Sequence, residues 1–106
     1  MIVNKTPHPV NIVSPQGDVV RVYERDATPI RLKQSVVADH PMADGTPTSR
    51  TVYGEPEGLP ERRDGVFYIV SQLVKSALPG RDDRLVPAEV VRDGEGNIIG
   101  CKSLGR

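Results

Sequence analysis

The stretch Val66-Phe67-Tyr68-Ile69-Val70 decides how this chain folds. All five residues are β-branched or aromatic, the types that are most enriched in strands. Both alternating sets of side chains are apolar, so both faces of a strand formed here have to be covered. The sequence therefore predicts a central strand that is buried on both sides.

A short helix is predicted directly after this strand. Ser71 has a side chain of the kind preferred at helix N-caps. Over residues 72–78, helical spacing places Leu73, Val74 and Ala77 on one side. Pro79-Gly80 then ends the helix. No other segment of the chain has a comparable helical pattern.

The remaining apolar segments are short and separated by turns, which is typical of strands. Residues 10–13 and 19–23 flank the turn 14–18 and predict a hairpin. Residues 28–38 predict a longer strand with Ile30, Leu32 and Val36 on one face. Further short strands are expected at residues 2–4, 51–54, 85–86, 90–91 and 97–101, with loops at 39–49 and 55–65 and a hairpin turn at 93–96.

These elements predict the α+β class: one small, β-rich domain of antiparallel strands with one short helix, spanning residues 1–106. Ten glycines and ten prolines fit many short elements joined by turns. A chain of 106 residues buries a thin core, and self-association is a natural way to bury more surface.

Charge and cysteine content restrict the class of protein. The 14 basic residues balance the 14 acidic ones, which disfavours binding to duplex nucleic acid. One cysteine, Cys101, excludes an internal disulfide framework and favours a reducing compartment. The sequence has no signal-peptide pattern and no apolar run near the ~20 residues of a membrane helix, so a cytosolic protein that does not contact membranes is expected.

A search for catalytic and cofactor motifs finds none with the spacing that it requires. His8 and His40 are far apart in the sequence and no metal-binding motif contains them, so no metal or other cofactor is expected. Cys101 lies in an apolar segment, which favours a buried, inert thiol. The paired carboxylates occur in Pro- and Gly-rich loops, where solvated turns are the usual explanation. The sequence therefore predicts a binding protein without a catalytic site.

The basic residues beside the predicted strands are the candidates for ligand binding. Ten of the 14 basic residues are arginine, which contacts phosphates with a planar fork and stacks on bases. Aromatic side chains hold bases as well, although the apolar neighbours of Phe67 favour a place in the core. The predicted ligand-binding set contains five basic residues, Arg21, Arg50, Arg81, Arg92 and Lys102. It also contains Thr51 and Asp83, which lie close to Arg50 and Arg81 in the sequence.

The order of several sequence blocks resembles a known family. The blocks are Asn4-Lys5-Thr6-Pro7-His8-Pro9-Val10, Arg21-Val22, Arg50-Thr51-Val52-Tyr53-Gly54-Glu55, Gly58-Leu59-Pro60, Tyr68-Ile69-Val70-Ser71, Arg81-Asp82-Asp83, Val86-Pro87, Val91-Arg92-Asp93 and Gly96-Asn97-Ile98-Ile99-Gly100-Cys101. Together they span about residues 4–104 and resemble the first family of Thoeris anti-defence proteins, which phages encode.

The resemblance implies a specific function. Proteins of this family are sponges that bind cyclic ADP-ribose isomers made by bacterial immune TIR enzymes and do not cleave them. Some also bind cyclic oligonucleotides of the CBASS system at separate sites, and they form dimers or hexamers. The resemblance implies pocket arginines at Arg21 and Arg50, and a basic group at Lys102, where the family pattern has arginine. It also implies action in the cytoplasm of the infected bacterial host.

Two other functions are compatible with these features. A phage structural or protein-interaction module would need no small-molecule ligand. A small hydrolase or nuclease is disfavoured, because the motif search finds no catalytic constellation.

Overall fold

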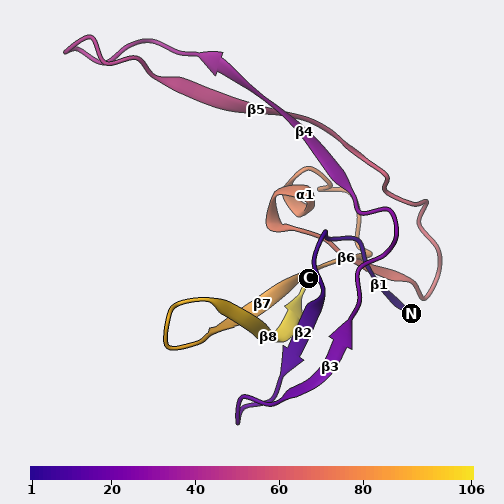
Figure 1. Ribbon diagram of the computed structural model, residues 1–106. Coiled ribbons are helices and arrows are strands. Elements are labelled where there is room, and N and C mark those ends of the chain that lie inside the picture. The colour runs from indigo at the N-terminus through magenta and orange to yellow at the C-terminus, as the bar shows by residue number, and fades with distance from the viewer.

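The computed structural model describes residues 1–106 as a six-stranded sheet, one helix and a separate two-stranded ribbon (Figure 1). The elements in chain order are β1 (Ile2–Asn4), β2 (Val10–Val13), β3 (Val19–Tyr23), β4 (Arg31–Ala38), β5 (Ser49–Glu57), β6 (Phe67–Ile69), α1 (Gln72–Ser76), β7 (Arg84–Arg92) and β8 (Ile98–Gly105). The small, mostly β fold with one short helix is confirmed.

The six-stranded sheet is mixed. The prediction of antiparallel strands is therefore wrong for three of the six strand pairings in the structure. Its order is β1-β6-β7-β8-β2-β3. The hairpins β2–β3 and β7–β8 are antiparallel, whereas β1–β6, β6–β7 and β2–β8 are parallel. Parallel neighbours need a crossover connection. The segment that contains α1 supplies it between β6 and β7, so the helix that follows the buried strand makes this pairing parallel.

Strand β6 is buried on both faces, as its sequence predicts. Tyr68, Ile69 and Val70 are 5%, 0% and 1% exposed. Ile69 packs in a cluster with Leu85 and Cys101. Tyr68 and Val70 belong to a second cluster, which also holds Val74 of α1 and Val86 of β7. Because neighbouring residues of β6 belong to different clusters, the strand separates two small cores.

Helix α1 forms where Ser71 predicts it. The Ser71 side chain accepts a hydrogen bond of 3.2 Å from the backbone N–H of Val74, which caps the first turn. Only Val74 is buried, and Leu73 is 52% exposed. At five residues, α1 is far shorter than the roughly 20 residues that a bilayer-spanning helix needs.

The C-terminal hairpin is longer than the sequence pattern predicts. Where two brief strands were expected, β7 runs without a break over nine residues, and β8 continues to Gly105. Pairing extends from Val86 opposite Gly105 to Arg92 opposite Ile98. The strand continues through Pro87, because Val86 and Ala88 on either side of it are both paired with β8.

Strands β4 and β5 form a ribbon, called the arm below, that leaves the body (Figure 1). The predicted loop 39–49 is the tip of this arm, and β5 extends beyond the predicted strand 51–54. Ile30 at its root is buried in the core, and Leu32 packs against it. Val36, predicted to share their buried face, is 69% exposed, because the arm has already left the body at that point.

The arm makes the chain unusually extended. Its radius of gyration is 17.0 Å, whereas a compact chain of this length would have about 13 Å. Only 13 of 106 residues are buried, which confirms the prediction of a thin core.

Asn4 ties the N-terminal loop to the sheet. Its amide nitrogen donates to the carbonyl oxygens of His8 and Tyr23 at 2.7 and 2.9 Å, and its Oδ1 accepts from the backbone N–H and hydroxyl of Thr6. The next residue, Lys5, is 4% exposed and donates to Asp26 at 2.7 Å. The first sequence block of the resemblance therefore has a structural role in this chain.

A glycine at a close approach gives the first prediction. A Cβ at Gly100 would lie 2.8 Å from the carbonyl oxygen of Asn11 and would collide with the side chain of Val13. Gly100→Ala should therefore destabilise the fold by about 1–3 kcal/mol. Gly94→Ala is the matched control, because nothing lies within 4 Å of that position. Denaturant unfolding of both variants checks this, and equal stability of the two would contradict the close approach.

Candidate functional site

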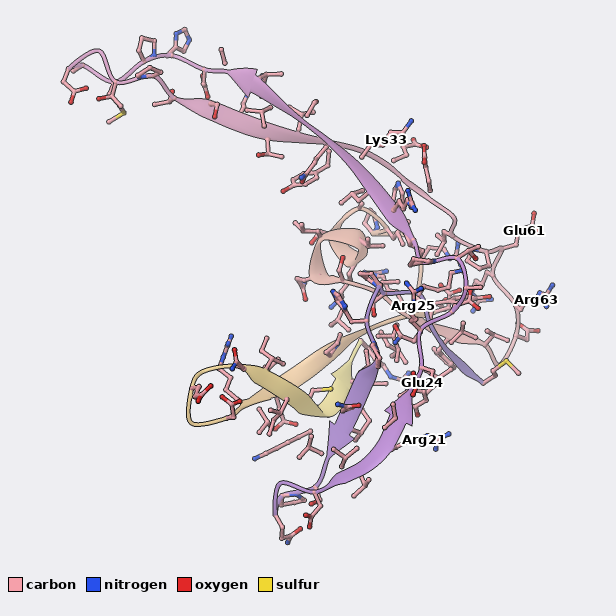
Figure 2. The ribbon with its side chains drawn as sticks, in the orientation of Figure 1. Arg21, Glu24, Arg25, Lys33, Glu61 and Arg63 are labelled. Carbon is pink, nitrogen blue, oxygen red and sulfur yellow. The ribbon has the colours of Figure 1, made fainter.

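The predicted ligand-binding residues lie in separate parts of the subunit. Arg21 is on edge strand β3, where its guanidinium stands 4.9 Å from the centre of the Tyr23 ring. Figure 2 shows it pointing away from the body. Arg50 and Thr51 are on the arm. Because adjacent strand residues point to opposite faces, their two side chains cannot face one ligand on the same side of the arm.

Arg92 and Lys102 lie on the C-terminal hairpin. The Arg92 guanidinium donates to the carbonyl oxygen of Gly96 at 2.9 Å and so closes the turn between β7 and β8. Lys102 is exposed on β8. Arg92 therefore has a structural partner in the subunit, whereas Lys102 has none.

Arg81 and Asp83 are the two predicted site residues that the structure brings together. Arg81 donates to both carboxylate oxygens of Asp83, at 2.9 and 2.7 Å, and also to the carbonyl oxygen of Pro60 at 3.1 Å. The Asp83 side chain is 5% exposed. The hydrogen bonds from Arg81 hold the pKa of Asp83 below its usual value, so Asp83 stays ionised. The pair fixes the loop before β6 against the start of β7.

Two further arginines meet beside this pair because of the strand register. Arg84 opens β7 opposite Tyr68 of β6. On the other side of β7, Gly105 of β8 lies opposite Val86, so Arg106 follows at the same end of the sheet. The start of β7 and the end of β8 therefore bring Arg81, Arg84 and Arg106 to one edge of the body.

These arginines line a cavity of about 380 Å³. The other lining residues are Pro79, Gly80 and Asp82. Neither Arg84 nor Arg106 has a carboxylate partner, and Nε of Arg84 is buried without any hydrogen-bond partner. Lys75 of α1 adds another cation, since its ammonium donates to the main-chain oxygen of Arg106 at 2.8 Å. Arg84 therefore keeps hydrogen-bonding capacity that no other group of the subunit uses.

An aromatic side chain lies beside this cavity. Arg106 and Asp82 also line a neighbouring hollow of about 210 Å³ that contains Phe67, and the Arg106 guanidinium stands 5.7 Å from the centre of the Phe67 ring. Arg62 closes part of its rim through a forked pair with Asp82, at 2.7 and 3.1 Å. This pair lowers the pKa of Asp82. We refer to Phe67, Arg81, Asp83, Arg84 and Arg106 as the arginine cluster.

Sequence reasoning found Arg81 and Asp83 but missed Arg84 and Arg106. Arg84 belongs to the charged run 81–84, whose spacing resembles a solvated turn. Arg106 could have been found only by knowing that β8 continues to Gly105. Phe67, assigned to the core, does pack against the buried cluster and is half-buried, which leaves its ring within reach of Arg106.

The other candidate reactive groups lie outside the arginine cluster. Cys101 is 1% exposed, and burial raises the pKa of its thiol, which confirms the prediction of a buried thiol. His8 and His40 are exposed. The structure contains no group of three or more His, Cys, Asp or Glu side chains arranged to hold a metal ion. The chemistry that the arginine cluster offers is recognition of an anion.

No protein-family model matches the chain, and no curated protein or solved structure matches it either. The resemblance to Thoeris anti-defence proteins therefore rests on the order of its sequence blocks.

The Arg81–Asp83 pair gives a pH-dependent prediction. Asp83→Asn should lower the free energy of unfolding at neutral pH by about 1.5–3 kcal/mol, since it breaks a charged, forked hydrogen bond. The folded-state pKa of Asp83 is lowered, so its contribution is complete above the unfolded value of 3.8 and is lost as the pH falls through the folded value. The difference between variant and wild type should therefore shrink below about pH 4.

Denaturant unfolding measured from pH 7 to pH 3 checks this. Asp64→Asn is the control, because its side chain is fully exposed and its nearest charged contact, with Arg62, is 3.7 Å long. A difference for Asp83→Asn that stays constant with pH would rule out the ion pair as its cause.

Proposed function

We propose that this protein binds a cyclic nucleotide signal and sequesters it without cleaving it. The observation that carries the proposal is the arginine cluster: guanidinium groups without carboxylate partners line a cavity, and one of them stands over an aromatic ring at its side. Cyclic ADP-ribose isomers are the ligands that the sequence resemblance favours, and CBASS cyclic oligonucleotides are the second class. The setting is phage anti-defence in the cytoplasm of the infected host.

The geometry suits a ligand with one pyrophosphate and one base. Arginine binds phosphate oxygens with two parallel hydrogen bonds, so two or three converging arginines suffice for a pyrophosphate. Four of the six residues that line the 380 Å³ cavity are charged, and three of these are arginines. Phe67 and Arg106 offer a stacking surface beside it. A protein with zero net charge can bind such a ligand, because three of its 14 basic residues, Arg81, Arg84 and Arg106, line one cavity.

The state of the carboxylates supports binding without catalysis. Asp82 and Asp83 line the hollow beside Phe67, and both have lowered pKa values because arginines hydrogen-bond to them. An acid that protonates a leaving group near neutral pH needs a raised pKa. Neither aspartate suits that role, and both are already held by ion pairs.

A protein-interaction module without a small-molecule ligand is the second candidate. The arm favours it, because most of its side chains are exposed and it packs on the body only at its root. Recovery of a stoichiometric heterologous protein partner from phage-infected cells, together with failure to bind any cyclic nucleotide, would select this function.

Binding should depend on the arginine cluster. Arg84→Ala and Arg106→Ala should each weaken binding of a cyclic ADP-ribose isomer by about tenfold or more, since a hydrogen bond to a charged group contributes about 1.5–3 kcal/mol. Calorimetric titration measures the affinity. Heating the wild-type complex should release intact ligand, which chromatography and mass spectrometry can identify.

Arg25→Ala is the matched control for charge. Arg25 is an exposed arginine that lines neither cavity, and its side chain makes no hydrogen bond or ion pair. Arg106 is exposed, so its variant tests the site even where Arg84→Ala weakens the fold. An equal loss of affinity in all three variants would show that binding depends on net charge and not on the arginine cluster. Cleaved ligand after heating would overturn sequestration.

Arg21→Ala and Arg50→Ala test the residues that the resemblance implies. On one subunit they lie on β3 and on the arm, so they can serve one ligand only where two copies meet. Loss of binding in these variants but not in Arg84→Ala or Arg106→Ala would move the site from the arginine cluster to a subunit interface. We propose that the working form is a dimer or hexamer in either case.

A further inference from the structure

The arm exposes one face of its ribbon that carries no charge. In the antiparallel register, Gln34 lies opposite Tyr53, Val36 opposite Thr51 and Ala38 opposite Ser49. Opposite residues share a face, as do every second residue along a strand. This uncharged face therefore consists of Gln34, Val36, Ala38, Ser49, Thr51 and Tyr53, while Lys33 and Arg50 lie on the other side.

An uncharged, exposed strand face is unusual for a part of the chain that only meets water. Projecting ribbons and edge strands normally carry charged side chains that keep them from associating. Depletion of charge together with aromatic enrichment is typical of the centre of a protein interface. Val36 and Tyr53 are 69% and 43% exposed, so this face is uncovered in the single subunit.

The uncharged face continues into a notch at the arm's root. A hollow of about 570 Å³ lies between the arm and the segment that follows α1, lined by Tyr53, Gly54, Glu55, Pro56, Leu59, Ala77 and Leu78. Tyr53 belongs to both surfaces. Leu73, on the same short helix, is 52% exposed. The subunit thus carries an uncharged ribbon face and a notch in which apolar side chains lie beside Glu55.

The accessible surface area of the chain indicates what covers the uncharged face and the notch. The accessible surface of the chain is 7506 Å², whereas a compact monomer of 11.6 kDa would expose about 5,800 Å². The excess of roughly 1,700 Å² per subunit is about twice the ~800 Å² that one partner contributes to a standard interface. A ribbon face and a notch that are both covered by a second copy would account for two such patches.

We propose that the arm of one copy lies in the notch of a second copy, and that the contact is reciprocal. A twofold pair uses the same two patches on both subunits, so no exposed patch is left over. The small side chains Ala38, Ser49 and Thr51 allow the partner's helix and arm root to approach closely. The inference needs no ligand, so it stands or falls independently of nucleotide binding.

This clasp separates two neighbouring residues of the predicted ligand set. Thr51 lies on the uncharged face and becomes buried against the partner. Arg50 lies on the opposite face and stays accessible. The clasp therefore leaves Arg50 available to a ligand and assigns Thr51 to the subunit contact.

The oligomeric state tests the clasp. Native mass spectrometry and light scattering across a concentration series should find the wild-type protein in even-numbered assemblies. Val36→Asp should weaken the pairing at least about tenfold, because it places a carboxylate in an apolar contact. Val36 is exposed in the subunit, so the substitution spares the fold. Val20→Asp is the control: Val20 is 63% exposed on β3, outside the arm and the notch. A monomeric wild type, or dissociation by Val20→Asp alone, would overturn the proposal.

Cross-linking tests the geometry. Val36→Cys and Leu73→Cys are made in separate preparations, so that mixing and mild oxidation can join only different copies. The buried Cys101 stays unreactive. The mixed disulfide should form at least about tenfold faster than with Val20→Cys in place of Val36→Cys. A homodisulfide of Val36→Cys that outpaces the mixed one would place arm against arm and refute the notch as the arm's seat.

Discussion

Burial of Tyr68 and Ile69 on opposite faces of β6, and of Val70 directly after it, is the constraint on which the rest of the structure depends. A strand of three residues cannot fill a core, so neighbours have to cover each face. One face takes Leu85 and Cys101 from the C-terminal hairpin and Val10 from β2. The other takes Val74 of the helix and Ile30 of the arm's root. Apart from the helix, which follows the strand directly, these covers come from other parts of the chain, and the strand pairing is accordingly mixed.

The same constraint positions the arginine cluster and the arm. Because β7 lies between β6 and β8, the register that buries Ile69 against Leu85 also sets Arg84 and Arg106 at one end of the sheet. Because Ile30 and Leu32 pack on the second core, the arm leaves the body beside α1 and creates the notch. The arginine cluster and the notch are therefore two consequences of one buried strand, and neither requires a large core.

The sequence predicts the elements better than their pairing. Period-two alternation, Ser71 and the Gly- and Pro-rich turns are local signals, and they locate the strands, the helix and the first hairpin. Parallel pairing of β6 with β1 and β7 depends on contacts between residues up to 65 positions apart, such as Ile2 with Phe67, which no local pattern encodes. The arginine cluster could not be predicted for the same reason. Arg84 and Arg106 are 22 positions apart, and only the strand register brings them together. Arg81 and Asp83 were both predicted as ligand-binding residues, but their pairing with each other was not predicted.

The distribution of ion pairs explains how a chain of zero net charge can recognise an anion. Lys5, Lys33, Arg62 and Arg81 are each held by a carboxylate, and Arg92 closes a turn. These contacts neutralise cations where the fold uses them. Asp82 and Asp83 are engaged by Arg62 and Arg81, so neither is free to pair with Arg84 or Arg106. Local pairing thus leaves unpaired guanidinium groups at one edge of the sheet, and an anion bound there does not have to displace an internal carboxylate. Recognition by such a site depends on which arginines are left without partners rather than on how many the chain contains.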